Sequence, residues 1–129
     1  MKFPQVAFFA AVVLLCVAPA QAGTVTFDLS MPSGVLGTSQ TYTAGPFTIT
    51  AYGFDSSGNP TDLYGKDLGG DESGLGLNND PSGQHEICCG NYIQLDLSSL
   101  VNNPGLAITI SSVQSGETCD IWGSDTWAH

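Results

Sequence analysis

The sequence predicts an all-β protein, an antiparallel β-sandwich of the jelly-roll or immunoglobulin-like class. The first observation is a series of short segments in which polar and apolar side chains alternate, as they do in half-buried strands. The second is the 16 glycines among 129 residues, well above the usual share of about 7%, which cluster with other turn-forming residues between those segments. The third is that no segment after residue 22 has the 3.6-residue apolar spacing and caps of a useful helix.

The first 22 residues have the pattern of a signal peptide. Lys2 is followed by the apolar stretch Val6–Val17, and Ala20 and Ala22 form the small-x-small pattern that signal peptidase recognises. We therefore expect cleavage after Ala22 and a single mature domain over residues 23–129. The apolar stretch is too short to cross the ~30 Å hydrocarbon core of a bilayer, so we expect no stable membrane insertion of this chain.

Two strong strands are expected in the first half of the mature chain. Thr24–Leu29 alternates polar and apolar residues, and Met31–Gly34 then turns the chain. After a looser segment, Phe47–Phe54 alternates again, with Phe47, Ile49 and Ala51 on one face. Asp55–Pro60 is a run of turn-forming residues, which predicts an exposed loop.

Shorter strands are expected in the second half. Leu63–Tyr64 and Leu75–Leu77 are long enough only for brief or edge strands. Further strands are predicted at Tyr92–Leu97, Ala107–Val113 and Thr118–Trp122. The sequence stops soon after the last of these without an element to cover the core and the sheet edges. We therefore expect a domain that is incomplete at its C-terminus.

The charge of the chain excludes several classes of partner. There are 12 acidic residues against two basic ones, for a net charge of -10. Removal of the leader takes Lys2 away and leaves Lys66 against all 12 acids. Such a domain repels phosphate backbones and anionic lipids, so neither nucleic-acid binding nor attachment to a membrane surface is expected.

Half of the acidic residues lie between residues 62 and 86, which predicts a calcium site. Carboxylate, amide and backbone oxygens are the ligands that Ca²⁺ prefers, and glycine-rich loops can arrange them around the ion. The alternative is that these acids are solvated loop charges that keep the protein soluble. The expected calcium ligands are Asp71, Glu72, Asn78, Asp80 and Glu86.

Three cysteines remain after removal of the leader, in an oxidising compartment. The simplest pairing is one disulfide from Cys119 to either Cys88 or Cys89, which leaves the third thiol free or paired outside the chain. A bridge between the adjacent Cys88 and Cys89 is an alternative that requires an unusual peptide geometry. With His85 the three cysteines also form a candidate zinc ligand set, and His85 with one of them forms a candidate nucleophilic pair.

The sequence favours a non-catalytic protein, with a polysaccharide-acting hydrolase or a carbohydrate-binding module as the alternative. No G-x-S-x-G, H-E-x-x-H or phosphate-binding glycine motif occurs, and the chain has only two histidines. A glycosidase needs two facing carboxyl groups, for which the candidates are Glu72, Glu86 and Glu117. Sugar rings would stack on exposed aromatic side chains, for which the candidates are Tyr64, Tyr92, Trp122 and Trp127.

Several segments after residue 60 resemble the main domain of proteins of the PEP-CTERM family. These are exported bacterial surface proteins that are sorted by an exosortase. These segments are Thr61–Lys66, Gly74–Asp80, His85–Ile87, Tyr92–Leu97 and Ser112–Glu117. The resemblance implies a secreted β-rich domain at the cell surface or in the extracellular matrix, often associated with exopolysaccharide and biofilm. The Pro-Glu-Pro motif, hydrophobic helix and basic cluster of that family are not found before His129, so we expect either a fragment or a freely secreted form.

Overall fold

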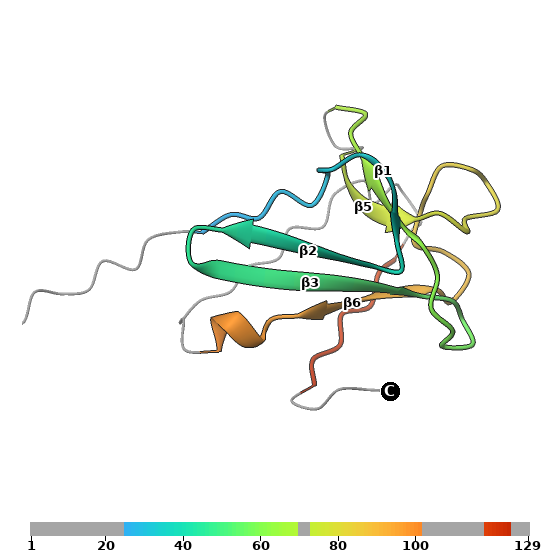
Figure 1. Ribbon diagram of the computed structural model, residues 1–129. Coiled ribbons are helices and arrows are strands. Elements are labelled where there is room, and N and C mark those ends of the chain that lie inside the picture. The colour runs from blue at the N-terminus through green and yellow to red at the C-terminus, as the bar shows by residue number, and fades with distance from the viewer. Residues whose placement is uncertain (1–24, 70–72, 102–117, 125–129) are drawn as a thin grey trace, which may run out of the picture.

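The computed structural model describes residues 25–69, 73–101 and 118–124, and its regular structure is almost entirely β. Two antiparallel three-stranded sheets are present (Figure 1). The first sheet has the order β1-β4-β5, with strands Gly34–Gly37, Leu63–Lys66 and Gly74–Leu77. The second has the order β2-β3-β6, with strands Ser39–Ala44, Phe47–Phe54 and Tyr92–Asp96. A 3₁₀ helix, η2, follows at Ser98–Leu100.

Strand β3 is the centre of the second sheet and confirms the predicted strand Phe47–Phe54. Its predicted inward face is also correct, because Ile49 and Ala51 are buried whereas Thr48 is exposed. β3 pairs with β2 through a two-residue turn that starts at Gly45, whose φ of 59° suits the first central position of a type II′ turn. β6 pairs on the other side and confirms the predicted strand at Tyr92–Leu97.

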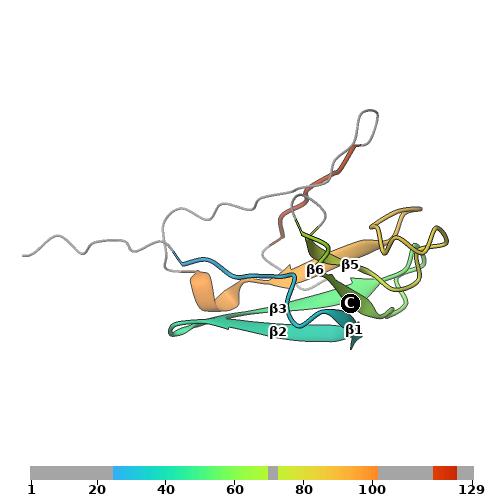
Figure 2. The ribbon, with the colours of Figure 1, turned by 90° about the horizontal axis from the view of Figure 1, so that it is seen from above.

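Strand β4 is the centre of the first sheet, and β5 is one of its edges. Leu63 of β4 and Leu77 of β5 lie opposite each other in the ladder, and both side chains are fully buried. Both strands have four residues, so the prediction of brief strands in this region is confirmed. Figures 1 and 2 show the first sheet at one end of the long β2–β3 hairpin.

The two sheets contribute to one hydrophobic core. Its buried members come from β2, β3, β4 and β5, and they are Tyr42, Ile49, Ala51, Leu63 and Leu77. Partly buried residues pack around them, including Phe27, Leu29, Ile93 and Leu95. The sheets approach closely at Gly53 of β3, where a Cβ atom would lie 3.0 Å from a methyl group of Leu77 and 2.5 Å from the carbonyl oxygen of Thr61.

Two predicted strands are wrong, and a third lies outside the described residues. Residues 25–29 form no strand, because no described strand pairs with them, and the Asp28 carboxylate accepts hydrogen bonds from the backbone N–H and the hydroxyl of Ser30 where the chain bends. Residues 118–122 form no strand either, and Ile121 and Trp122 are exposed without a ladder partner among the described residues. The predicted strand Ala107–Val113 lies outside the described residues.

Strands β1 and β2 lie in the segment for which the sequence predicted only loose structure. β2 has one large apolar residue, Tyr42, so its alternation is weak even though Tyr42 is buried in the core. β1 has four residues, of which Gly34 and Gly37 have positive φ. β1 pairs with β4, and β2 pairs with β3. These two strands therefore depend on tertiary pairing more than on their own sequence pattern.

The close approach at Gly53 leads to a test of the sheet packing. We expect Gly53→Ala to lower the free energy of unfolding by about 1–3 kcal/mol, because the added methyl group meets backbone as well as side-chain atoms. Urea unfolding followed by far-UV circular dichroism measures this change. Gly123→Ala is the matched control, since a Cβ at Gly123 meets nothing within 4 Å. Equal stability of the two variants would contradict the close packing of Gly53 against Thr61 and Leu77.

Candidate functional site

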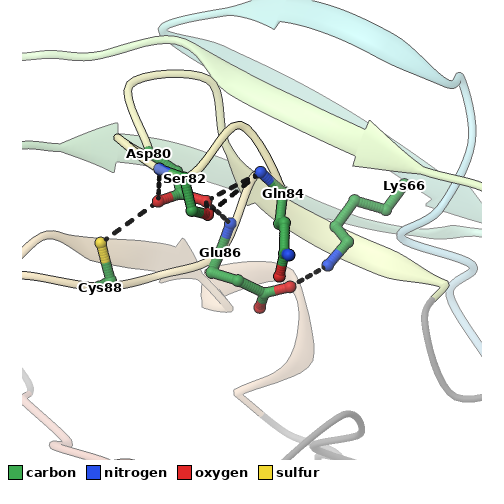
Figure 3. A network of polar contacts seen from close by, with 6 residues as sticks. All are labelled: Lys66, Asp80, Ser82, Gln84, Glu86 and Cys88. Atoms are coloured by element: carbon green, nitrogen blue, oxygen red, sulfur yellow. Dashed lines mark hydrogen bonds and ion pairs between the residues drawn. The ribbon is translucent and has the colours of Figure 1, made fainter.

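The candidate site is the Asp80 loop, which we define as residues 78–91, between β5 and β6. It begins with two turns after β5 and covers part of the first sheet. Figure 3 shows its central network, in which backbone N–H groups of the loop and the side chains of Ser82 and Cys88 point to the carboxylate of Asp80. The sequence signal for it is Asp80-Pro81-Ser82-Gly83, a run in which an aspartate accepts hydrogen bonds from the residues that follow it.

The Asp80 carboxylate is buried and accepts five hydrogen bonds from its own loop (Figure 3). Its Oδ1 accepts from the backbone N–H of Ser82 at 3.0 Å and from the Cys88 thiol at 3.6 Å. Its Oδ2 accepts from the Ser82 hydroxyl at 2.5 Å and from the backbone N–H groups of Gln84 and Glu86, each at 3.1 Å. These donors, with the Ser82 hydroxyl first, hold the pKa of Asp80 well below its ordinary value of 3.8.

The loop is attached to the first sheet through His85 and Glu86. The imidazole of His85 stacks on the ring of Tyr64, with centroids 3.5 Å apart and an angle of 6° between the planes. The carbonyl oxygen of His85 accepts the N–H of Leu77 at 3.2 Å. Glu86 forms an ion pair with the buried Lys66, with 2.5 Å between Oε1 and Nζ.

Glycine at position 76 makes this attachment possible. Gly76 is the ladder partner of Tyr64, and a Cβ atom at Gly76 would collide with the carbonyl group of His85. His85 itself has a φ of 60°, which is uncommon for a residue other than glycine. The backbone of the loop therefore lies directly on the sheet, in a conformation that the surrounding contacts must maintain.

The structure brings only part of the predicted calcium ligands together. Asp80 and Glu86 share the loop, but Asp80 faces hydrogen-bond donors and Glu86 faces Lys66. Asn78 is exposed and donates its backbone N–H to the carbonyl of Asp62 at 2.8 Å. Asp71 and Glu72 lie outside the described residues. A cation at Asp80 would have to displace N–H donors, so calcium remains a prediction that depends on the other ligands.

No group of three or more histidine, cysteine or acidic side chains suited to a metal ion is present in residues 25–69, 73–101 and 118–124. The cysteines of that part of the chain are free thiols. The Sγ atoms of Cys88 and Cys89 lie 2.7 Å apart, and Cys119 is exposed. The disulfide from Cys119 to Cys88 or Cys89 stays a prediction.

An open pocket of about 780 Å³ lies between β4 and the Asp80 loop. Tyr64, Lys66, Asp67, Leu68, Gln84 and His85 are among the residues that line it. The Nδ1 atom of His85 is buried, and it has no hydrogen-bond partner within the described part of the chain. The pocket thus combines an aromatic pair with a cation that is already neutralised by Glu86.

The residues proposed for a carbohydrate or hydrolase site are scattered. Tyr64 has one ring face covered by His85, and Tyr92 stacks on Phe54 with centroids 5.0 Å apart. Trp122 is 88% exposed. Trp127, Glu72 and Glu117 lie outside the described residues, and Glu86 is paired with Lys66.

Comparisons with protein-family models, with curated proteins and with solved structures found no match to this chain. Within the described residues, no helix is long and apolar enough to cross a bilayer. The function of the Asp80 loop is therefore inferred from its own geometry.

The Asp80 network leads to a prediction on pH and stability. Because folding lowers the pKa of Asp80, its ionised form stabilises the fold above its ordinary pKa of 3.8, and this contribution is lost as the pH falls below that value. Asp80→Asn places an amide NH₂ among N–H donors, so we expect its melting temperature at neutral pH to be several degrees below that of the wild type. Circular dichroism melts between pH 7 and pH 2 should show this difference closing on acidification.

The exposed Asp67 supplies a matched control for this experiment, because Asp67→Asn makes the same change in charge. We expect its melting curves to follow those of the wild type at each pH. Asp28 and Asp55 also have lowered pKa values, so the wild type and Asp80→Asn both lose stability in acid. A difference between wild type and Asp80→Asn that stays constant down to pH 2 would contradict the role given to the Asp80 carboxylate.

Proposed function

We propose that this chain is a non-catalytic exported protein of the cell surface or extracellular matrix, associated with exopolysaccharide. The observation that carries the proposal is that three aspartate carboxylates accept hydrogen bonds from the residues that follow them and so stabilise turns. Asp28 accepts from Ser30, Asp55 accepts from Ser57 and Asn59, and Asp80 accepts from its loop. The leader pattern and the resemblance to the PEP-CTERM family support the location.

The same three carboxylates argue against an acid–base catalyst. Hydrogen bonds from neighbouring N–H and O–H groups lower the pKa of Asp28, Asp55 and Asp80. A glycosidase instead needs one carboxylic acid whose pKa is raised, so that it can donate a proton near neutral pH. Carboxylates kept ionised in turns supply stability and solubility, which suits a surface protein.

We infer a β-sandwich as the finer architecture. Its support is the single core cluster to which Ile49 and Ala51 of the second sheet and Leu63 and Leu77 of the first contribute. Sheets that share a core through their inner faces are the defining feature of sandwiches. The choice between a jelly-roll and an immunoglobulin-like topology depends on the predicted strand Ala107–Val113, which lies outside the described residues.

A carbohydrate-binding module is the second candidate. The pocket beside Tyr64 and His85 favours it, together with the highly exposed indole of Trp122. Aromatic rings stack on the apolar faces of sugars, and such a site needs no catalytic acid.

The proposed function is tested by secretion and by polysaccharide binding. Expressed with its own leader, the protein should leave the cell, begin at Gly23, and sediment with extracellular polysaccharide without releasing reducing ends. Trp122→Ala should leave this association unchanged if the protein is a matrix component. Val101→Ala, which alters another exposed apolar residue, is the matched control.

Two outcomes would contradict the proposal. Release of reducing ends that rises with protein concentration would identify a hydrolase. A loss of about tenfold in affinity for the purified polysaccharide in Trp122→Ala alone, equivalent to about 1.4 kcal/mol, would identify a carbohydrate-binding module.

Calcium dependence has its own test. If Asp71, Glu72 and Asn78 supply a weak site of the extracellular type, a few millimolar Ca²⁺ should raise the melting temperature, because the ion binds only the folded state. Magnesium is the control ion, and Asp71→Asn should remove the response. An unchanged melting temperature in calcium would show that these acids are solvated surface charges.

A further inference from the structure

The backbone around the two adjacent cysteines forms a tight turn. The N–H of Asn91 donates to the carbonyl of Cys88 at 2.9 Å, which closes a four-residue β-turn. Its central residues, Cys89 and Gly90, have φ values of 62° and 81°, the signs that a type I′ turn requires. Glycine adopts this conformation readily, whereas cysteine rarely does. Cys89 therefore occupies a conformation that the fold imposes on it.

The turn is anchored from two directions. The side-chain oxygen of Asn91 accepts the N–H of Ser56 at 3.0 Å, and its amide nitrogen donates to Asn79 at 3.3 Å. The Cys88 thiol donates to Asp80 at 3.6 Å. These contacts join the turn both to the Asp55–Pro60 loop and to the start of the Asp80 loop.

This turn brings together two sulfur atoms that a strand would separate. Side chains of neighbouring residues in a strand point to opposite faces, but the Sγ atoms of Cys88 and Cys89 are 2.7 Å apart. Adjacent Cα atoms are only about 3.8 Å apart, closer than in ordinary disulfides, so a bridge between neighbours needs a bent backbone. The turn at residues 88–91 provides one.

We propose that Cys88 and Cys89 form a reversible disulfide with each other, which makes this turn a two-electron exchange site for external disulfides. Two structural features carry the proposal: the imposed left-handed conformation of Cys89 and the convergence of the two sulfur atoms. The reacting partner is any accessible disulfide of the exported compartment, and oxidised glutathione is its simplest probe.

The two cysteines have different roles in the exchange. Cys89 is exposed, whereas Cys88 is half-buried. The hydrogen bond with Cys89, burial and the nearby Asp80 carboxylate together raise the pKa of Cys88 to about 12, so its thiol remains protonated at neutral pH. Cys89 is therefore the attacking residue, and Cys88 resolves the intermediate.

The Cys89 thiolate attacks one sulfur of the external disulfide, which forms a mixed disulfide and releases one thiolate. That thiolate takes the proton of the Cys88 thiol, and the Cys88 sulfur then attacks Cys89 Sγ and displaces the second thiolate, which is protonated by water. Two cysteine thiols are oxidised to one disulfide, and one external disulfide is reduced to two thiols.

Oxidation has a consequence inside the Asp80 loop. A disulfide sulfur has no hydrogen to donate, so the bond from Cys88 to Asp80 is lost while the four donors from Ser82, Gln84 and Glu86 remain. The redox state of the pair thus changes the environment of the carboxylate that organises the loop.

A glutamate-specific protease can separate the possible pairings. Cleavage after Glu86 and Glu117 places Cys88 and Cys89 on one peptide, residues 87–117, and Cys119 on another, residues 118–129. We expect the reduced full-length mature protein, incubated with oxidised glutathione and digested without reductant, to yield peptide 87–117 lighter by two hydrogen atoms. Dithiothreitol should restore its mass, and Cys119→Ser, the matched control, should give the same result.

Single substitutions test the order of events. Cys88→Ser removes the resolving thiol and should trap glutathione on Cys89. Cys89→Ser should react more slowly than Cys88→Ser at neutral pH. Three results would overturn the proposal: a disulfide that links peptides 87–117 and 118–129, stable glutathione adducts on the wild-type pair, or two thiols in peptide 87–117 that stay reduced.

Discussion

The Asp80 carboxylate accepts five hydrogen bonds from its own loop, and the other contacts of the site depend on this arrangement. Donors at positions 82, 84, 86 and 88 converge on it, so the chain between them must wrap around the anion. That path brings His85 onto Tyr64 and Glu86 to Lys66. A buried carboxylate without these donors would be costly, so the loop and its anion stabilise each other.

Close backbone packing is the second requirement, and glycines on the first sheet satisfy it. A Cβ atom at Gly65 would collide with the carbonyl oxygen of Pro32, just as one at Gly76 would collide with His85. The segment before β1 and the Asp80 loop therefore both lie against the first sheet at glycines. Some glycines thus allow close contact between backbone segments, in addition to those that form turns.

The parts of the fold that were predictable from sequence are those in which local pattern and tertiary environment agree. β3 and β6 alternate large apolar residues with polar ones, and both lie where the pattern placed them. Residues 25–29 show the same alternation, and Phe27 and Leu29 do pack on the core, but the segment lacks a ladder. In this segment alternation marked two side chains that pack on the core, whereas hydrogen-bonded pairing depends on the rest of the chain.

The same distinction applies to the site. Asp80 and Glu86 were identified from the sequence as candidate calcium ligands. Composition does not show whether a carboxylate faces hydrogen-bond donors or a cation. In the folded loop the backbone N–H groups face Asp80, and Lys66, the only lysine or arginine after residue 22, pairs with Glu86. A strongly acidic chain can therefore stabilise a buried carboxylate with its own backbone N–H groups, which every residue except proline carries. Because the Cys88 thiol donates to Oδ1 of Asp80, any reaction that removes the thiol hydrogen also removes one of the five hydrogen bonds that stabilise this carboxylate.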